Sequence, residues 1–282
     1  MSSLFIRLGI GLLFSIFALF NYFVNVTENP ITGEKQRLQL SPRQEVIIGL
    51  QSRQEMAAKH NGLYPDQTLQ AYVDQVGDRI VQQSSVNQSS YPFEFHLLRD
   101  TQTINAFALP GGQVFITAAL LGRLNSEAQL AGVLGHEIAH VVARHGAEHL
   151  AKQQLGAALV NAVGIAASDT PESARQAAIL AQAVNQMVNL KYGREDELES
   201  DRLGFRFMTE AGYNPQGIVE LMQILASSRN GQQPAEFFST HPNPGNRTER
   251  LGAIIQENFP NGIPAELEEG QQKFAQIVGS RL

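Results

Sequence analysis

The stretch His136-Glu137-Ile138-Ala139-His140 carries the residue types that bind a metal ion and activate water. Its two histidines are four positions apart, so in a helix they share one face, about 40° apart around the axis. Two imidazoles placed in this way can bind one Zn²⁺, and the intervening glutamate can reach water on the same ion. The pattern predicts hydrolysis of amide bonds, because a metal ion beside a carboxylate base supplies that chemistry.

The flanking residues favour metal binding over a chance match of three letters in an unrelated helix. Ser126 and Gln129 form a capping-box pattern that begins a helix before the motif. Apolar residues then recur every three or four positions: Leu130, Val133, Leu134, Ile138 and Val141. This apolar stripe predicts a helix that packs against a core and holds both histidines in fixed directions.

A catalytic zinc site needs a third protein ligand, and neither the metzincin extension of the motif nor its inverted order is present. The candidate is an acidic cluster downstream. Glu197 and Asp201 are four apart and share a helix face, so Glu197 could bind the metal while Asp201 orients a ligand histidine. Glu195 and Glu199 have the same spacing, so spacing alone does not show which pair lies at the metal. Taken alone, the cluster is also typical of a solvated helix start, where carboxylates favour the helix dipole.

The chain resembles the HtpX/BepA/LoiP-type gluzincins, which are membrane-associated zinc metallopeptidases related to the CAAX prenyl protease. The resemblance runs from about Pro42 to Leu251, which is most of the chain. Three blocks in the right order carry it: H-E-x-x-H-V-x-x-R-H from His136 to His145, E-x-E-x-D from Glu197 to Asp201, and Ser239-Thr240-His241-Pro242. The resemblance also covers Asn105-Ala106-Phe107-Ala108-Leu109-Pro110-Gly111-Gly112.

In that family the ligand glutamate lies four residues before the aspartate. The resemblance therefore implies that His136, His140 and Glu197 bind one Zn²⁺ per chain, and that Asp201 orients a ligand. Ser200 departs from the family, in which many members have alanine at this position, but one small side chain replaces another.

The sequence leaves alternative roles open for three more histidines and one arginine. His241 matches a family position near the zinc, where it could cap the open coordination position in a resting form or stabilise an oxyanion; the alternative is an ordinary loop histidine. Arg247 could bring positive charge to the same cleft or form an ordinary salt bridge. His145 matches the family pattern, which favours a supporting or packing role, and together with His149 it mimics a second metal site that lacks a glutamate ligand.

Composition is typical of one sizeable globular domain, since 43% of the 282 residues are hydrophobic and 17% are charged. The net charge is −6 and the basic residues are scattered, so no nucleic-acid partner is expected. The chain has no cysteine, which excludes disulfides, thiolate zinc ligands and cysteine catalysis.

Residues 8–26 are strongly apolar and have about the length of a bilayer span. We expect an uncleaved signal anchor in residues 1–27, with a cleaved signal peptide as the alternative. A linker (28–40), a metallopeptidase domain (41–260) and a C-terminal surface helix (261–282) should follow. The resemblance implies a bacterial envelope location, with the enzyme anchored in the inner membrane and facing the periplasm, or secreted there after signal cleavage.

The expected fold is α+β: a mostly helical zincin-like domain with a small sheet. Helices are predicted from Pro42 to about Lys59 and from about Thr68 to Ser84, and a strand–turn–strand hairpin from Asn105 to Thr117. The edge strand near Asn105 to Ala108 could pair with an extended peptide. The segment from Gly146 to Tyr192 should hold two helices that either cover the cleft or pack as a buried hairpin.

The predicted function is zinc-dependent endopeptidase activity on misfolded or unassembled envelope proteins, with Glu137 as the base. A chaperone-like outer-membrane assembly factor with a latent protease site is the alternative. A prenyl-protein protease of the CAAX type is a third possibility, which the single apolar segment disfavours because multi-span members build a membrane chamber.

Overall fold

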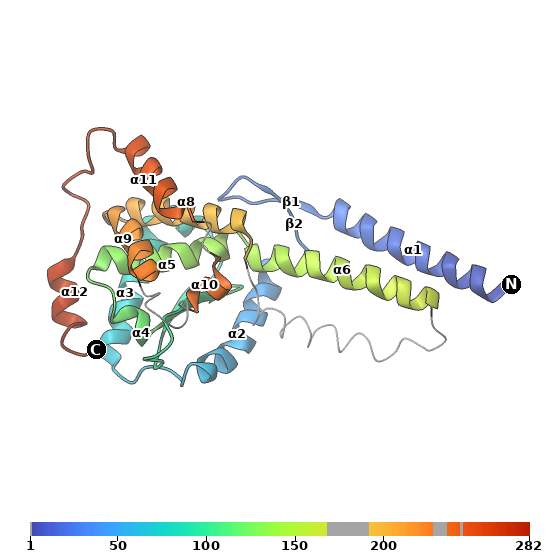
Figure 1. Cartoon of the computed structure of the whole chain (residues 1–282), viewed down its shortest axis with the longest axis horizontal. Helices are drawn as coiled ribbons and strands as arrows, with labels where there is room; N and C mark the ends of the chain where they lie inside the picture. Colours follow the sequence, from blue (N-terminus) through green and yellow to red (C-terminus); the bar gives the residue numbers. More distant parts are fainter. Residues whose placement is uncertain (1, 168–191, 228–235, 243–244) are drawn as a thin grey trace.

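The helix that carries His136 and His140 runs through the middle of the folded body, between a small sheet and the C-terminal helices (Figure 1). The computed structural model describes residues 2–167, 192–227, 236–242 and 245–282. Over these residues the fold is mostly helical with two small sheets, which agrees with the predicted α+β class. The elements are α1 (Ser2–Val24), β1 (Val26–Glu28), β2 (Lys35–Arg37), α2 (Pro42–Lys59), α3 (Gln67–Gln83), η1 (Ser85–Gln88), β3 (Glu94–Leu98), β4 (Ala106–Leu109), β5 (Gln113–Thr117), α4 (Ala118–Leu121), α5 (Glu127–Val142), α6 (His145–Ala167), α8 (Arg194–Glu210), α9 (Gln216–Ser227), α10 (Phe237–Thr240), α11 (Arg247–Asn258) and α12 (Gln271–Ile277).

A three-stranded sheet with the order β3-β5-β4 lies beside α5. β4 and β5 form the predicted antiparallel hairpin, and β3 runs parallel to β5. The hairpin turn requires glycine, because Gly111 has a φ of 82° and a Cβ there would lie 2.3 Å from the backbone of α2. Ala106 and Ala108 pack into the main core, whereas Phe107 and Leu109 pack on the opposite face. β4 is therefore an edge strand with both faces covered.

α5 is buried along its whole length, and glycines allow its neighbours to approach closely. Ser126 caps the helix as predicted, since its side chain accepts a hydrogen bond from the backbone N–H of Gln129 at 3.1 Å. A Cβ on Gly204 of α8 would lie 3.0 Å from the backbone nitrogen of His136. A Cβ on Gly135 would lie 3.2 Å from the carbonyl oxygen of Gly204. The two helices therefore cross with their backbones in contact, next to the first histidine of the motif.

The segment predicted to be a linker is instead a small hairpin, in which β1 and β2 pair antiparallel. The side chain of Asn29 donates a hydrogen bond to the carbonyl of Val142 at 2.8 Å, and the side chain of Gln36 donates one to the carbonyl of Ala143. Both carbonyls belong to the end of α5 and have no partner further along that helix. The hairpin thus caps the helix that carries the motif.

The C-terminal segment differs from the predicted surface helix, because its helix, α12, spans only Gln271–Ile277. Phe274 and Val278 are buried in the main core. The backbone N–H of Ala128 donates to the carbonyl of Glu269 at 3.0 Å, and Lys273 Nζ lies 3.0 Å from the carboxylate of Glu127. The segment packs on the start of α5 and helps to fix that helix.

α1 and α6 lie side by side and extend away from the rest of the fold (Figure 1). Among the residues that the structure describes, no helix combines the length and the apolar character needed to cross a membrane, so the predicted N-terminal anchor is not supported. α6 begins at His145, earlier than predicted, and over its described length it leads away from the site instead of covering it. The second predicted helix of this segment, with the polar turn before it, lies outside the described residues.

The glycine contact between α5 and α8 generates a stability prediction. Gly204→Ala should destabilise the fold by about 1–3 kcal/mol, because the added methyl group would force the two backbones apart. The matched control is Gly252→Ala in α11, where a Cβ would meet no atom within 4 Å. The control should leave stability unchanged or raise it slightly through helix propensity. Urea unfolding of the three proteins measures both effects, and equal stabilities of both variants would contradict the argument.

Candidate metal centre

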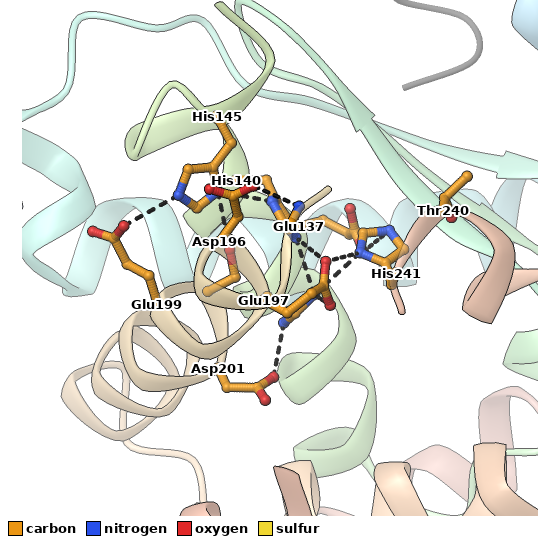
Figure 2. A network of polar contacts seen from close by, with 12 residues as sticks. Glu137, His140, His145, Asp196, Glu197, Glu199, Asp201, Thr240 and His241 are labelled. Carbon is orange, nitrogen blue, oxygen red and sulfur yellow. Dashed lines mark hydrogen bonds and ion pairs between the residues drawn. The ribbon is translucent and has the colours of Figure 1, made fainter. Parts of the chain in front are cut away.

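Four buried side chains from three parts of the chain converge on one point (Figure 2). His136 and His140 come from α5, Glu197 comes from α8, and His241 follows α10. One ligand atom from each of the four lies within 4.8 Å of the others. The Nε2 atoms of His136 and His140 are 3.1 Å apart, and Glu197 oxygens lie 3.5 Å and 3.4 Å from them. We call these four residues the ligand cluster.

The buried charges around the ligand cluster fit a divalent cation. Glu137, Glu197 and Asp201 supply three carboxylates, and Arg247 supplies one guanidinium, all almost completely buried. With neutral histidines, two negative charges are therefore uncompensated in a region of low dielectric, which is strongly unfavourable. Both oxygens of Glu137 are buried without a hydrogen-bond partner among the described residues. A cation with two positive charges would balance this set, and imidazole with carboxylate is a donor combination that suits zinc.

His136 is oriented from its far side by an ion pair. Its Nδ1 lies 3.1 Å from Asp201 Oδ1, and Arg247 holds both oxygens of Asp201, with Nε 2.7 Å from Oδ2 and Nη2 2.5 Å from Oδ1. Burial alone would raise the pKa of Asp201, but the charge and hydrogen bonds of Arg247 keep this pKa below its usual value. The predicted spacing of Glu197 and Asp201 thus places one carboxylate on each side of the same imidazole.

The two motif histidines differ in their affinity for protons. Burial lowers the pKa of His140 well below its usual value. Burial acts in the same direction on His136, but hydrogen bonds to Asp201 and Glu197 overcome it and raise the pKa of His136 to about 9. In the absence of a metal, His136 therefore carries a proton at neutral pH, and a metal that binds there must displace it.

Glu137 points toward the ligand cluster from the same helix (Figure 2). Its Oε1 lies 3.6 Å from His241 Nε2. Burial raises the pKa of the Glu137 carboxyl, which brings it closer to the range in which a carboxylate exchanges protons at neutral pH.

His241 lies in the cluster as a possible fourth ligand. Its Nδ1 is 2.9 Å from Glu197 Oε1 and 3.4 Å from His136 Nε2. Its ring stacks on Phe237, with centroids 4.5 Å apart, and its backbone N–H donates to the carbonyl of Phe237 at 2.7 Å. Arg247, for which the sequence left two roles open, forms a buried ion pair, with Nη1 2.9 Å from Glu197 Oε2.

The structure separates the two candidate acidic pairs. Glu197 reaches the motif histidines, whereas Glu199 lies 3.2 Å from His145 Nε2, and Glu195 is exposed. His149 pairs with another carboxylate of α8, Asp196 Oδ2, at 2.6 Å. His145 and His149 thus contact two different carboxylates of α8. Within the described ranges they form no second metal-binding group.

Tyr192 is a site residue that the sequence did not suggest. Its ring stacks on His140, with centroids 3.9 Å apart, and its backbone N–H donates to the carbonyl of Thr240 at 3.1 Å. No spacing rule points to it, because ring stacking and a backbone hydrogen bond between distant segments bring it to the site.

A cavity of about 360 Å³ opens beside the ligand cluster and runs along β4. Asn105, Phe107, Tyr192 and His241 are among the residues that line it. The carbonyl of Asn105 accepts a hydrogen bond from the backbone N–H of Thr117 in β5 at 3.0 Å. In an antiparallel pair the bonded positions alternate, so the main-chain groups of the alanines at positions 106 and 108 point away from β5.

Comparison with known proteins agrees with this geometry. Residues 67–255, more than half of the chain, match peptidase family M48. The beta-barrel assembly-enhancing protease of Yersinia pestis is 35% identical over 225 residues, which cover 77% of this chain and 45% of that protein. The protein of the same name from Escherichia coli K12 is 34% identical over 190 residues, covering 66% of this chain and 38% of that protein. The mitochondrial metalloendopeptidase OMA1 of Saccharomyces cerevisiae is 29% identical over 275 residues, covering 87% and 73%.

The chain thus spans less than half the length of these bacterial relatives. The match to the family nevertheless includes the motif helix and the acidic helix that meets it. This chain belongs to peptidase family M48.

Proposed function

We propose that the chain is a zinc-dependent endopeptidase in which His136, His140 and Glu197 bind one Zn²⁺. The observation that carries the proposal is the convergence of these three side chains in a buried region that holds three carboxylates and one guanidinium. Family membership supports the same activity.

Bound zinc would act as a Lewis acid toward the scissile carbonyl and toward water. Glu137 takes the proton from the attacking water and later delivers it to the leaving amine. Its raised pKa supports this role, because the base must hold a proton between the two transfers. Asp201 and Arg247 keep His136 in a fixed orientation. No covalent intermediate with the protein is required.

The substrate is an extended peptide that pairs with the edge of β4. The outward main-chain groups of Ala106 and Ala108 offer hydrogen bonds that do not depend on the side chains of the substrate. The adjoining cavity, which reaches from Phe107 to His241, has room for substrate side chains.

The biological setting that we propose follows the relatives. Two of them are named for the assembly of β-barrels, which in bacteria are outer-membrane proteins. Misfolded or unassembled envelope proteins are therefore the substrates that we infer, with the enzyme in the periplasm. α1 exposes large apolar side chains, including Phe5, Leu12, Phe17 and Phe20, and such a surface supports contact of the N-terminal segment with the membrane.

Replacing the base tests the enzymatic proposal. Glu137→Gln should lower casein cleavage by about 100- to 10,000-fold, because the amide cannot accept the proton. Zinc content should stay near one ion per chain, since Glu137 is not a ligand. Glu195→Gln makes the same change at an exposed carboxylate and should keep full activity. Cleavage that survives in Glu137→Gln, or in fully chelated protein, would rule out the mechanism.

A latent protease that acts mainly as an assembly factor is the second candidate, and the position of His241 favours it. A fourth protein ligand would occupy the coordination position that catalysis requires to be open. His241→Ala should then raise casein cleavage several-fold while zinc remains bound. Glu137→Gln in the same background should abolish the gain. A loss of cleavage in His241→Ala would instead support stabilisation of the oxyanion by this histidine.

The pKa of His136 predicts how zinc affinity depends on pH. Zinc binds the neutral imidazole, and below about pH 9 this imidazole is protonated in the metal-free chain. The apparent affinity should therefore fall about tenfold per pH unit as pH is lowered from about 9 to about 7. Asp201→Asn removes the hydrogen bond that raises the pKa, so its affinity should depend less on pH over this range. Competition with a fluorescent chelator measures both, and an affinity of the unmodified chain that does not change with pH would contradict the assignment.

A further inference from the structure

His145 lies directly behind His140, on the side away from the ligand cluster (Figure 2). The Nδ1 atoms of the two rings are 2.9 Å apart. The other nitrogen of His145, Nε2, lies 3.2 Å from Glu199 Oε2. His145 is almost completely buried, and the Glu199 side chain is 14% exposed. The three side chains form a row from the site toward the surface.

The row admits a single arrangement of protons once His140 binds zinc through Nε2, the atom that faces His136 and Glu197. A neutral ligand histidine carries its proton on the other nitrogen, Nδ1. His140 Nδ1–H must then donate to His145 Nδ1, so His145 carries its own proton on Nε2 and donates it to Glu199. Each donor in the row finds an acceptor.

We propose that His145, held by Glu199, is the positioning residue that orients His140 for zinc. This inference rests on the proposed function, because it takes His140 as a zinc ligand. The two motif histidines therefore have different partners. His136 contacts the carboxylate of Asp201 directly, whereas His140 contacts the imidazole of His145, which in turn contacts the carboxylate of Glu199.

The backbone before His145 is built for this contact. Arg144 has a φ of 57°, a left-handed conformation that is unfavourable for a residue with a side chain. It turns the chain sharply between α5 and α6, and thereby brings His145 back over His140. Arg144 is held there by Glu45 of α2, whose carboxylate lies 2.9 Å from Nε, and by the carbonyl of Leu40, 2.8 Å from Nη2. A strained residue fixed by a partly buried ion pair is expected where the position of the next side chain matters.

The contact also explains why Glu199 is not the metal ligand despite its helical spacing. Its carboxylate accepts from His145. Glu199 is two residues from both Glu197 and Asp201, so it lies about 200° around the helix from each of them. Ser200 Oγ lies 3.4 Å from His145 Nδ1, so the hydroxyl adds a polar neighbour at the same nitrogen.

Zinc affinity measured by chelator competition tests the inference on the full chain. His145→Ala should weaken zinc binding about 10- to 100-fold, the range typical for loss of an outer partner of a metal ligand. His145→Asn, which keeps a hydrogen-bond acceptor near the place of Nδ1, should recover most of the loss. The matched control is His149→Ala, which removes another contact between α6 and α8 one turn away and should leave the affinity unchanged. His145→Ala that binds zinc as tightly as this control would overturn the proposal.

A second readout does not depend on the variants. In ¹⁵N NMR of the zinc-loaded chain, His145 should be neutral with its proton on Nε2, and Glu199→Ala should perturb its signals. A proton on Nδ1 of His145 would overturn the proposal even if His145→Ala failed to fold. Failure of the unmodified chain to bind zinc would instead refute the proposed function, so the two failures are distinguishable.

Discussion

The contact between two glycines, Gly135 in α5 and Gly204 in α8, sets the geometry on which the site depends. Helices with ordinary side chains between them pack with their axes about 8–10 Å apart. Here the backbones touch, and the contact lies beside His136. Glu197 and Asp201 precede Gly204 by seven and three residues, so they lie on the same face of α8, toward α5. A short carboxylate side chain can therefore reach the imidazoles without a loop.

The close crossing has an electrostatic consequence. It buries more negative than positive charge, and the surrounding structure compensates in part. Arg247 at the start of α11 forms ion pairs with Glu197 and Asp201, and this brings the C-terminal third of the chain into the site. The remaining imbalance is what a divalent ion would cancel. The fold without metal should therefore be less stable around α5 and α8 than elsewhere, because an uncompensated buried charge opposes packing.

The sequence predicted the local parts of this arrangement and missed the contacts between distant segments. The motif helix, its Ser126 cap and the β4–β5 hairpin follow from spacing and turn residues that act over a few positions. Spacing also restricted the third ligand to two pairs, and the resemblance favoured Glu197.

The structure differs from the sequence-based expectations in segments whose conformation is set by contacts with distant residues. Asn29 bonds to Val142, which is 113 positions later, and no local pattern distinguishes such a hairpin from a linker. Likewise, Phe274 packs in the main core because α3 and α5 leave space for it, which a surface-like sequence does not reveal. The stacking of Tyr192 on His140 depends on ring geometry that only the assembled fold defines.

The residues between the cavity and the ligand cluster contact both the edge strand and the candidate metal ligands. Tyr192 covers His140, and its backbone holds Thr240, the residue before His241. Phe237 stacks on His241 and bonds through its own N–H to the carbonyl of Ile104, immediately before the edge-strand segment. A peptide that enters along β4 therefore meets the same segment that carries the fourth candidate ligand. Because the His241 ring packs against Tyr192 and Phe237, the proposed binding of a peptide at the edge strand would be energetically coupled to the position of His241.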